Sequence, residues 1–326
     1  MPILTFVYQA WDMSYIITDY QILSAIMPVR LVRWKNPSAL LQLIPSVLQS
    51  EVVFVWFARG PASTTAFVLS RIFRKKIVVV AGGSEVSPAI QRSGIRSAIG
   101  FLLTRIILNN SDLVIAVSHF NKREIFAVSR PKDIRVVYLG IDTNKFRPGP
   151  SKSLDVLTVA AGTGRFQFLR KGLDRFAELA NRLPARGFIA VGELASTREY
   201  KQCFGKNVRL TGSVSNNVLI SYFQRTRFYC QLSRHEQFGV AVAEAMATEC
   251  VPVVSDRGAL PEVVGNCGII VRGGDPIVAS EAIEESWGHC ERLGRLARER
   301  VQAHYSVEKR IVCFKEIFSE LLPNRF

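Results

Sequence analysis

Two glutamates flank a Phe-Gly pair in residues 233–247, SRHEQFGVAVAEAMA, which follow an apolar run and lead into an Ala-rich helical pattern. Seven residues separate Glu236 from Glu244, so both carboxylates can face one ligand from different depths. Carboxylates bind the hydroxyls of a sugar or a ribose through charge-assisted hydrogen bonds. Gly239 stands at the expected helix start, where free N–H groups and the helix dipole favour an anion. We therefore expect a diphosphate on the backbone of Phe238–Val240.

Each glutamate also has a simpler explanation. Glu236 alone fits an exposed acid in a loop, and Glu244 alone fits an acid on a helix surface. Their combination around one Phe-Gly pair, followed by an apolar helix, favours the ligand site.

A second cluster, residues 162–174, has the sequence GTGRFQFLRKGLD and also follows an apolar run. Its glycines allow a tight turn, which places Arg165 and Lys171 at a strand-to-helix junction. Cations there can neutralise the charge that builds up on a departing diphosphate. The G-x-G is incomplete as a dinucleotide motif, so an ordinary turn with solvated basic residues is the alternative.

Short apolar runs alternate with longer helical patterns, which predicts an α/β protein with parallel sheets built from right-handed βαβ units. Continuous apolar strands are typical of sheets that helices cover on both faces. The expected strands are Ile3–Val7, Val52–Phe57, Ile77–Val80, Leu113–Val117, Ile134–Tyr138, Leu154–Ala160, Gly187–Val191, Val208–Thr211, Phe228–Leu232, Val251–Val254 and Gly268–Val271.

Pro and Gly interrupt this alternation at residues 142–150, DTNKFRPGP, which we interpret as a linker. The length of 326 residues also favours two domains of about 150 residues each. We expect a Rossmann-like domain over residues 1–147, a second one over 148–305, and a separate final helix over 306–326. Two doubly wound parallel-sheet domains would leave a cleft at the carboxyl ends of their strands, where such folds bind ligands.

The balance of 42 basic against 27 acidic residues gives a net charge of +15, which indicates an anionic partner. We expect no nucleic-acid partner, because the chain has no RNP, zinc or helix-turn-helix signature. The six cysteines show no C-x-x-C spacing, which predicts reduced thiols in a cytoplasmic protein and no zinc site. No stretch reaches the roughly 20 apolar residues that a membrane-spanning helix needs.

The C-terminal half resembles glycosyltransferase family 4, a retaining family with the GT-B fold. Its hallmark, S-x-x-E-G-F-G-x-x-x-x-E-A-M-A, is matched by Ser233, Glu236, Phe238, Gly239, Glu244, Ala245, Met246 and Ala247. The resemblance is specific from about residue 112 to residue 275 and faint before residue 110. The further segments that carry it are residues 117–118, 138–142, 146–148, 171–172, 252–255, 258–262, 268–271 and 274–275, together with Arg165.

The resemblance implies a role for each residue of the site. Arg165 and Lys171 would bind the diphosphate of a nucleotide sugar and stabilise it as the leaving group. Glu236 would hold hydroxyls of the sugar, and Glu244 would bind the ribose. The remaining donor-site residues, which contribute backbone amides or a further carboxylate, are Phe238, Gly239, Val240 and Glu262.

The implied function is retaining transfer of a hexosyl group from a nucleoside-diphosphate sugar to a glycan or a lipid-linked acceptor. The family needs no metal or other cofactor, and none of the nine aspartates here lies two residues from another, as a metal-binding D-x-D would require. The alternatives are a sugar-nucleotide-processing enzyme of the same fold, such as an epimerase, and an inactive family member.

The chain departs from the family pattern at several places, one of which is the stretch Tyr8–Ser14, where many members carry a glycine-rich loop and this chain has no glycine. Gln237 replaces the usual glycine, and Glu249-Cys250 stands where a glycine is usual. Many members carry a histidine after a strand of the first domain, where this chain has Ala81-Gly82-Gly83-Ser84-Glu85. We expect Gly83 or Glu85 to take over that role on the acceptor side.

Basic residues also gather beside the apolar segment Ile95–Leu108, and the only acid between residues 71 and 110 is Glu85. Each basic residue near an anionic membrane contributes about 1 kcal/mol to binding, so this region could hold the protein on the inner face of the cell membrane. The alternative is a buried helix with solvated charges around it. The basic residues concerned are Arg71, Arg74, Lys75, Lys76, Arg92, Arg96 and Arg105.

The apolar periodicity of residues 306–326 predicts a helix with one apolar face, formed by Ile311, Phe314, Ile317, Phe318 and Leu321. The resemblance implies that this helix returns to the first domain, as the final helix of GT-B proteins does.

Overall fold

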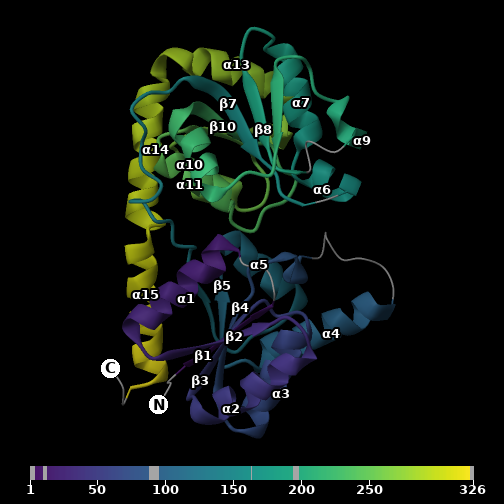
Figure 1. The fold of residues 1–326 in the computed structure, drawn as a ribbon, viewed down its shortest axis with the longest axis vertical. Coiled ribbons are helices and arrows are strands. Elements are labelled where there is room, and N and C mark those ends of the chain that lie inside the picture. The colour runs from purple at the N-terminus through teal and green to yellow at the C-terminus, as the bar shows by residue number, and fades with distance from the viewer. Residues whose placement is uncertain (1–3, 10–12, 88–94, 163, 194–197, 324–326) are drawn as a thin grey trace. The chain divides into compact units, whose positions relative to one another are not determined.

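The computed structural model describes residues 4–9, 13–87, 95–162, 164–193 and 198–323. The chain forms two compact units, which Figure 1 shows as ribbons. The first unit is Met1–Gly140 together with Val307–Phe326, and the second unit is Ile141–Ser306.

The boundary between the units lies at Gly140 and Ile141, seven residues before the expected boundary at residue 147. The segment interpreted as a linker is held on the second unit. Arg298 donates to the carbonyl oxygens of Phe146 (3.0 Å) and Thr143 (3.3 Å), and the Phe146 ring contacts Phe223. These contacts explain why the division falls before the Pro- and Gly-rich segment and not within it.

The first unit contains a parallel six-stranded sheet in the order β2-β1-β3-β4-β5-β6. Its strands are β1 (Leu4–Gln9), β2 (Val29–Trp34), β3 (Val52–Trp56), β4 (Lys76–Val80), β5 (Leu113–Ala116) and β6 (Ile134–Val136). Sequence patterns predicted all of these except β2. Its sequence, VRLVRW, contains two arginines that interrupt the apolar run, and its place at the edge of the sheet accommodates them.

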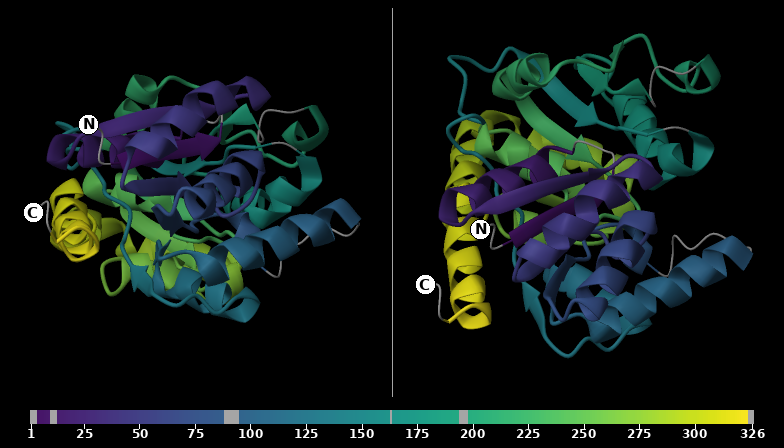
Figure 2. Two further views of the ribbon diagram at one scale, coloured as in Figure 1. Left: turned by 90° about the horizontal axis from the view of Figure 1, so that it is seen from below. Right: turned by 60° about the horizontal axis from the view of Figure 1, so that its bottom comes forward.

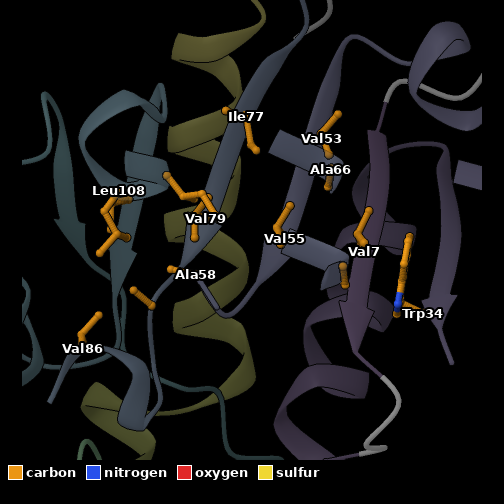
Figure 3. Close-up of a cluster of buried hydrophobic side chains, with 14 of the residues drawn as sticks. Val7, Trp34, Val53, Val55, Ala58, Ala66, Ile77, Val79, Val86 and Leu108 are labelled. Atoms are coloured by element: carbon orange, nitrogen blue, oxygen red, sulfur yellow. The ribbon is translucent and has the colours of Figure 1, made fainter. Parts of the chain in front are cut away.

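Helices cover both faces of this sheet. One face packs against α2 (Leu40–Gln49), α3 (Pro61–Ile72), α4 (Ile95–Asn110) and α5 (His119–Val128). Val7, Val55 and Val79, from three neighbouring strands, form part of that core (Figure 3). The other face packs against α1 (Ser14–Ile26) and α15 (Val307–Leu321), and α15 lies on the opposite side of the sheet from α4 (Figures 1 and 2).

The helix α15 joins the core of the first unit through aromatic residues. Phe314 meets the ring of Phe54 edge-on, with the ring centroids 5.8 Å apart, and Phe318 packs beside it. Phe314, Ile317 and Phe318 of the predicted apolar face are buried, whereas Ile311 and Leu321 are half-buried.

A buried arginine completes this face of α15. Arg310 is 1% exposed, and its Nη2 donates to Oδ2 of Asp19 on α1 at 2.7 Å. Its Nη1 donates to the carbonyl oxygens of Val137 (2.8 Å) and Tyr138 (2.6 Å). Trp56 donates to the same aspartate at 3.0 Å. Because all of these groups are paired, the charges of Arg310 and Asp19 can be buried.

The second unit contains another parallel six-stranded sheet, in the order β12-β11-β10-β7-β8-β9. Its strands are β7 (Leu154–Val159), β8 (Phe188–Val191), β9 (Val208–Gly212), β10 (Thr226–Gln231), β11 (Val251–Ser255) and β12 (Ile269–Val271). All six coincide with predicted strands to within two residues. Two Rossmann-like α/β units are thereby confirmed.

Helices again lie on both faces of this sheet. The core on one face includes α7 (Leu173–Arg182) and α13 (Pro276–Ser286). The other helices of the second unit are α6 (Gly164–Arg170), α9 (Arg198–Lys201), α10 (Asn216–Arg225), α11 (Val240–Ala247), α12 (Leu260–Val264) and α14 (Cys290–His304). No helix within the described ranges combines the length and the apolar character that a bilayer span requires.

Candidate active site

The centre of the candidate site is the carboxylate of Glu236, which follows the carboxyl end of β10. Its Oε1 accepts hydrogen bonds from Lys171 Nζ (2.7 Å), Gln231 Nε2 (2.8 Å) and Ser233 Oγ (3.1 Å). Burial alone would raise the pKa of Glu236, but the charges of Lys171 and Arg170 and these hydrogen bonds bring it below its usual range. Glu236 is therefore an ionised carboxylate in a largely buried setting.

Lys171 reaches this carboxylate because the turn between α6 and α7 lies against the end of β10. Gly172 has a φ of +71°, and a Cβ at this position would stand 2.2 Å from the carbonyl oxygen of Leu232. Only glycine permits both this conformation and this close approach. The structure thus brings together Lys171 and Glu236, 65 residues apart in the chain.

Arg165 is not part of this contact. It lies in the first turn of α6 with an exposed side chain, and no ion pair or hydrogen bond restrains it among the residues that the structure describes. Thr163, within the same glycine-rich turn, lies outside the described residues.

The start of α11 forms the next part of the site. Gly239 precedes this helix with a φ of +93°, and a Cβ there would come within 2.8 Å of Leu260 Cδ2. The side chain of Phe238 is 2% exposed and meets the ring of Tyr305 edge-on. Phe238 therefore fixes the turn by packing, while Gly239 and Val240 bring the first amides of the helix to the carboxyl edge of the sheet.

Glu244 lies inside α11 and is 9% exposed. Burial raises its pKa to about 8, against a smaller opposing effect of the charge on Lys145. The side chain is consequently protonated at neutral pH. This property was not expected from the sequence, which predicted a carboxylate that accepts hydrogen bonds.

Glu262 lies on α12, where its backbone carbonyl oxygen accepts hydrogen bonds from Arg300 Nη2 (2.8 Å) and the hydroxyl of Tyr305 (2.9 Å). The preceding loop holds the backbone of Glu236. Ala259 N–H donates to the Glu236 carbonyl oxygen at 2.9 Å, and Gly258, with a φ of +66°, packs directly on the Glu236 backbone. The loop before α12 therefore fixes the position of Glu236 in the turn.

Sequence reasoning missed the role of Gln231. It orients the Glu236 carboxylate and is itself held by a hydrogen bond from the Tyr229 hydroxyl at 2.9 Å. Its position as the last residue of a buried strand was the available signal, because a polar side chain there must point to a partner or a ligand.

On the first unit, Gly83 and Glu85 follow β4 at the carboxyl edge of the sheet. Glu85 is 6% exposed and accepts a long hydrogen bond (3.3 Å) from the Gly83 N–H. Burial raises the pKa of Glu85 to about 7, although backbone hydrogen bonds and the charge of Arg59 oppose this. Its protonation state therefore changes near neutral pH.

Phe57, which sequence reasoning did not select, lies beside this pair. It directly follows β3 with a φ of +69°, a strained conformation for an aromatic residue, and a Cβ on Gly83 would lie 2.9 Å from its ring. Strain of this kind persists where the surrounding structure holds a residue in place, often at a ligand site.

Within the described part of the chain, no three His, Cys, Asp or Glu side chains come together in a way that could hold a metal ion.

Comparison with known families and structures identifies the class of protein. The model described as Glycosyltransferase Family 4 matches residues 15–145, and the one described as Glycosyl transferases group 1 matches residues 158–288. The chain is a family 4-type glycosyltransferase. The second match contains Lys171, Glu236, Glu244 and Glu262.

Curated relatives of this glycosyltransferase are about a quarter to a third identical to it over the aligned segments. The N-acetyl-alpha-D-glucosaminyl L-malate synthase of Bacillus anthracis is 26% identical over 76% of this chain and 69% of its own length. The GDP-mannose:cellobiosyl-diphosphopolyprenol alpha-mannosyltransferase of Xanthomonas campestris is 31% identical over 44% of this chain and 40% of its own length.

Solved structures confirm the fold over both units. The sucrose-phosphate synthase of Thermosynechococcus elongatus superposes with a TM-score of 0.77 at 17% identity, covering 99% of this chain and 100% of that one. Anabaena Alr3699/HepE, solved in complex with UDP and glucose, superposes with a TM-score of 0.78 at 15% identity, covering 98% of this chain and 100% of that one. The glycosyltransferase therefore has the GT-B fold.

Proposed function

We propose that this glycosyltransferase moves a sugar, with retention of configuration, from a nucleoside-diphosphate sugar to a glycan or lipid-linked acceptor. The observation that carries the proposal is the pair of Lys171 and Glu236 beside the glycine-headed start of α11. This arrangement offers a cation, backbone amides and a carboxylate to one ligand, and those groups match a diphosphate joined to a sugar.

The chemical step follows from these groups. The bond between the sugar C1 and the diphosphate oxygen breaks, and the acceptor oxygen bonds to C1 on the same face. The departing phosphate oxygen takes up the acceptor proton. Lys171 and the first amides of α11 stabilise the charge on the leaving group, and Arg165 would join them once a donor is bound.

Glu236 would hold hydroxyls of the transferred sugar, and its bond to Lys171 would couple sugar recognition to the leaving group. Glu244 would bind the ribose. The other donor contacts would come from Phe238, Gly239, Val240 and Glu262. We expect the reaction to need no metal, since the leaving-group charge is met by protein cations and amides.

On the acceptor side, we propose that Glu85 accepts a hydrogen bond from an acceptor hydroxyl and that Phe57 and Gly83 position it. The relative from Xanthomonas is named for a diphosphopolyprenol acceptor, which supports a lipid-linked acceptor among the candidates. Cys203, Cys230, Cys250, Cys267, Cys290 and Cys313 are all free, which supports a reducing compartment such as the cytoplasm.

The donor is tested first by thermal denaturation with UDP-, GDP- and ADP-sugars. A donor present at 100 times its dissociation constant stabilises the folded protein by about 2.7 kcal/mol. The responding donor is then used for transfer, and the anomeric configuration of the product is read by NMR. An inverted product, or isomerised sugar without transfer, would refute the proposal.

The catalytic role of Lys171 is tested by Lys171→Met, with Lys206→Met as the matched control. Lys206 is exposed after α9 and should be dispensable. Loss of a group that stabilises transition-state charge typically lowers the rate by about 10²–10³. We expect that loss for Lys171→Met and also a large loss for Arg165→Ala, with near-normal rates in the control. Wild-type turnover in both site variants would contradict the donor-site assignment.

A further inference from the structure

The three neighbouring helices α2, α3 and α4 of the first unit expose a set of aliphatic side chains. Among the described residues, eight of the fifteen large apolar side chains that are well exposed lie on these helices. Leu41 is 81% exposed, Ile72 64% and Leu102 56%. We call this set the apolar face; it consists of Leu41, Ile44, Leu48, Val68, Ile72, Ile99, Leu102 and Ile106.

The spacing shows that the apolar face is a property of the helices. On α2 the exposed residues stand at positions i, i+3 and i+7 (Leu41, Ile44, Leu48), and α4 repeats this spacing with Ile99, Leu102 and Ile106. Such residues share one side of a helix. Since α3 contacts both α2 and α4, the three stripes belong to one side of the sheet (Figure 1).

The charge around the apolar face is predominantly positive. Residues 37–110 include eight basic and two acidic residues, and one of the two acids, Glu85, is buried. Arg74 and Arg105 are exposed on or beside these helices, and Arg105 lies between Leu102 and Ile106 in the sequence. Arg92 and the side chain of Arg96 lie outside the described residues. The first unit as a whole has 20 basic and 10 acidic residues.

A groove of about 490 Å³ opens between α3 and α4 within this region. Its lining is partly apolar (Ile99, Leu103), with the guanidinium of Arg59 beside Gly100 and the hydroxyl of Thr64. An apolar floor with a cation suits a lipid chain that ends in an anionic headgroup.

From these observations we infer that the apolar face docks on an anionic lipid surface. Aliphatic side chains would enter the headgroup boundary while the basic residues pair with lipid phosphates. A second copy of the chain is a poorer occupant, because a symmetric contact would bring two basic rims together. The inference deepens the proposed function. Since α3 follows β3 and α4 follows β4, docking here would bring a membrane-held acceptor to the carboxyl edge that carries Phe57 and Glu85.

The test is co-sedimentation of the full chain with phosphatidylcholine vesicles, with and without phosphatidylglycerol. We expect binding only when phosphatidylglycerol is present, and weaker binding as salt is added. Leu102→Gln should lower the vesicle partition coefficient about tenfold, the effect of withholding one leucine from an apolar environment. Arg74→Gln should lower it about fivefold on the anionic vesicles, the effect of one basic residue near such a surface.

Val312→Gln is the matched control, because Val312 is 51% exposed on α15, on the opposite side of the sheet. Its binding should equal that of the wild type. The inference would be overturned if the wild type did not bind phosphatidylglycerol vesicles, or if Leu102→Gln bound them as well as the wild type does. An equal loss of vesicle binding in Val312→Gln would also overturn it. So would a dimer of the wild type in sedimentation that the Leu102→Gln substitution converts to monomer. Thermal stabilisation by a nucleotide sugar, measured on the same variants, reports separately on the donor site.

Discussion

The buried acid Glu244 gives the sharpest test of the electrostatics of the site. Glutamine has nearly the shape of a protonated glutamate but cannot release a proton. The variant Glu244→Gln should therefore keep the packing of α11 and remove one titration from the folded protein.

The sign and size of the effect follow from the two pKa values. Burial raises the pKa of Glu244 from its ordinary value of 4.5 to about 8. Between these values the folded protein holds a proton that the unfolded chain has released, so the free energy of unfolding falls as pH rises. The slope approaches 1.4 kcal/mol per pH unit, which amounts to about 3–4 kcal/mol between about pH 5 and about pH 8. Glu244→Gln should not show this loss, so its stability relative to the wild type should rise by that amount.

The assay is hydrogen exchange followed by mass spectrometry on peptides from β10 and α11, which reports on the second unit alone. Comparing the two proteins at each pH cancels the intrinsic pH dependence of exchange, and also the titration of Glu85, which both proteins share. The exposed Glu281 on α13 supplies the control Glu281→Gln, which should leave protection of these peptides unchanged. If the difference in hydrogen-exchange protection between Glu244→Gln and the wild type stayed constant across the pH range, the raised pKa of Glu244 would be refuted.

Further predictions concern the first unit and the donor. Arg310→Met should destabilise the first unit by about 3–5 kcal/mol in chemical denaturation, because it leaves Asp19 buried without its partner; the double variant with Asp19→Leu should recover most of that loss. The rate of transfer should rise as pH passes through about 7, where Glu85 loses its proton, and Glu85→Gln should abolish that step in the pH–rate profile. UDP, GDP or ADP without the sugar should bind Glu236→Gln with nearly wild-type affinity in calorimetry, whereas the sugar nucleotide should bind more weakly; equal losses for both ligands would show that Glu236 does not contact the sugar.

Most of the fold could be predicted because its strands are buried on both faces. Runs such as VVFVW in β3 and VPVVS in β11 are continuous apolar segments, which identify strands covered by helices. The edge strand β2 was missed because its arginines break the run. The apolar periodicity of α15 was visible, but Arg310 on the same face was not, since a hydrophobic pattern contains no information about a charge that is buried with a partner 291 residues away.

In the site too, features set by neighbouring residues in the sequence could be predicted, whereas features set by tertiary contacts could not. Glu236, Gly239 and Glu244 are close in sequence, and their spacing made them visible. The contact of Lys171 with Glu236 depends on Gly172 lying against Leu232, a tertiary contact. The left-handed conformation of Phe57 and the raised pKa of Glu244 arise from packing alone, so no residue pattern predicts them.

The return of α15 to the first unit has a consequence for the order of synthesis. Residues 4–136 contain all six strands of the first sheet, yet Phe314, Phe318 and Arg310 are still missing when those strands leave the ribosome. Until α15 has been synthesised, the part of the sheet that it covers is exposed and Asp19 lacks its partner Arg310. The second unit is continuous in sequence and can fold as soon as it emerges. The unit translated first should therefore be the last to become stable, and during translation its apolar strands are the part of the chain most exposed to chaperones and to aggregation.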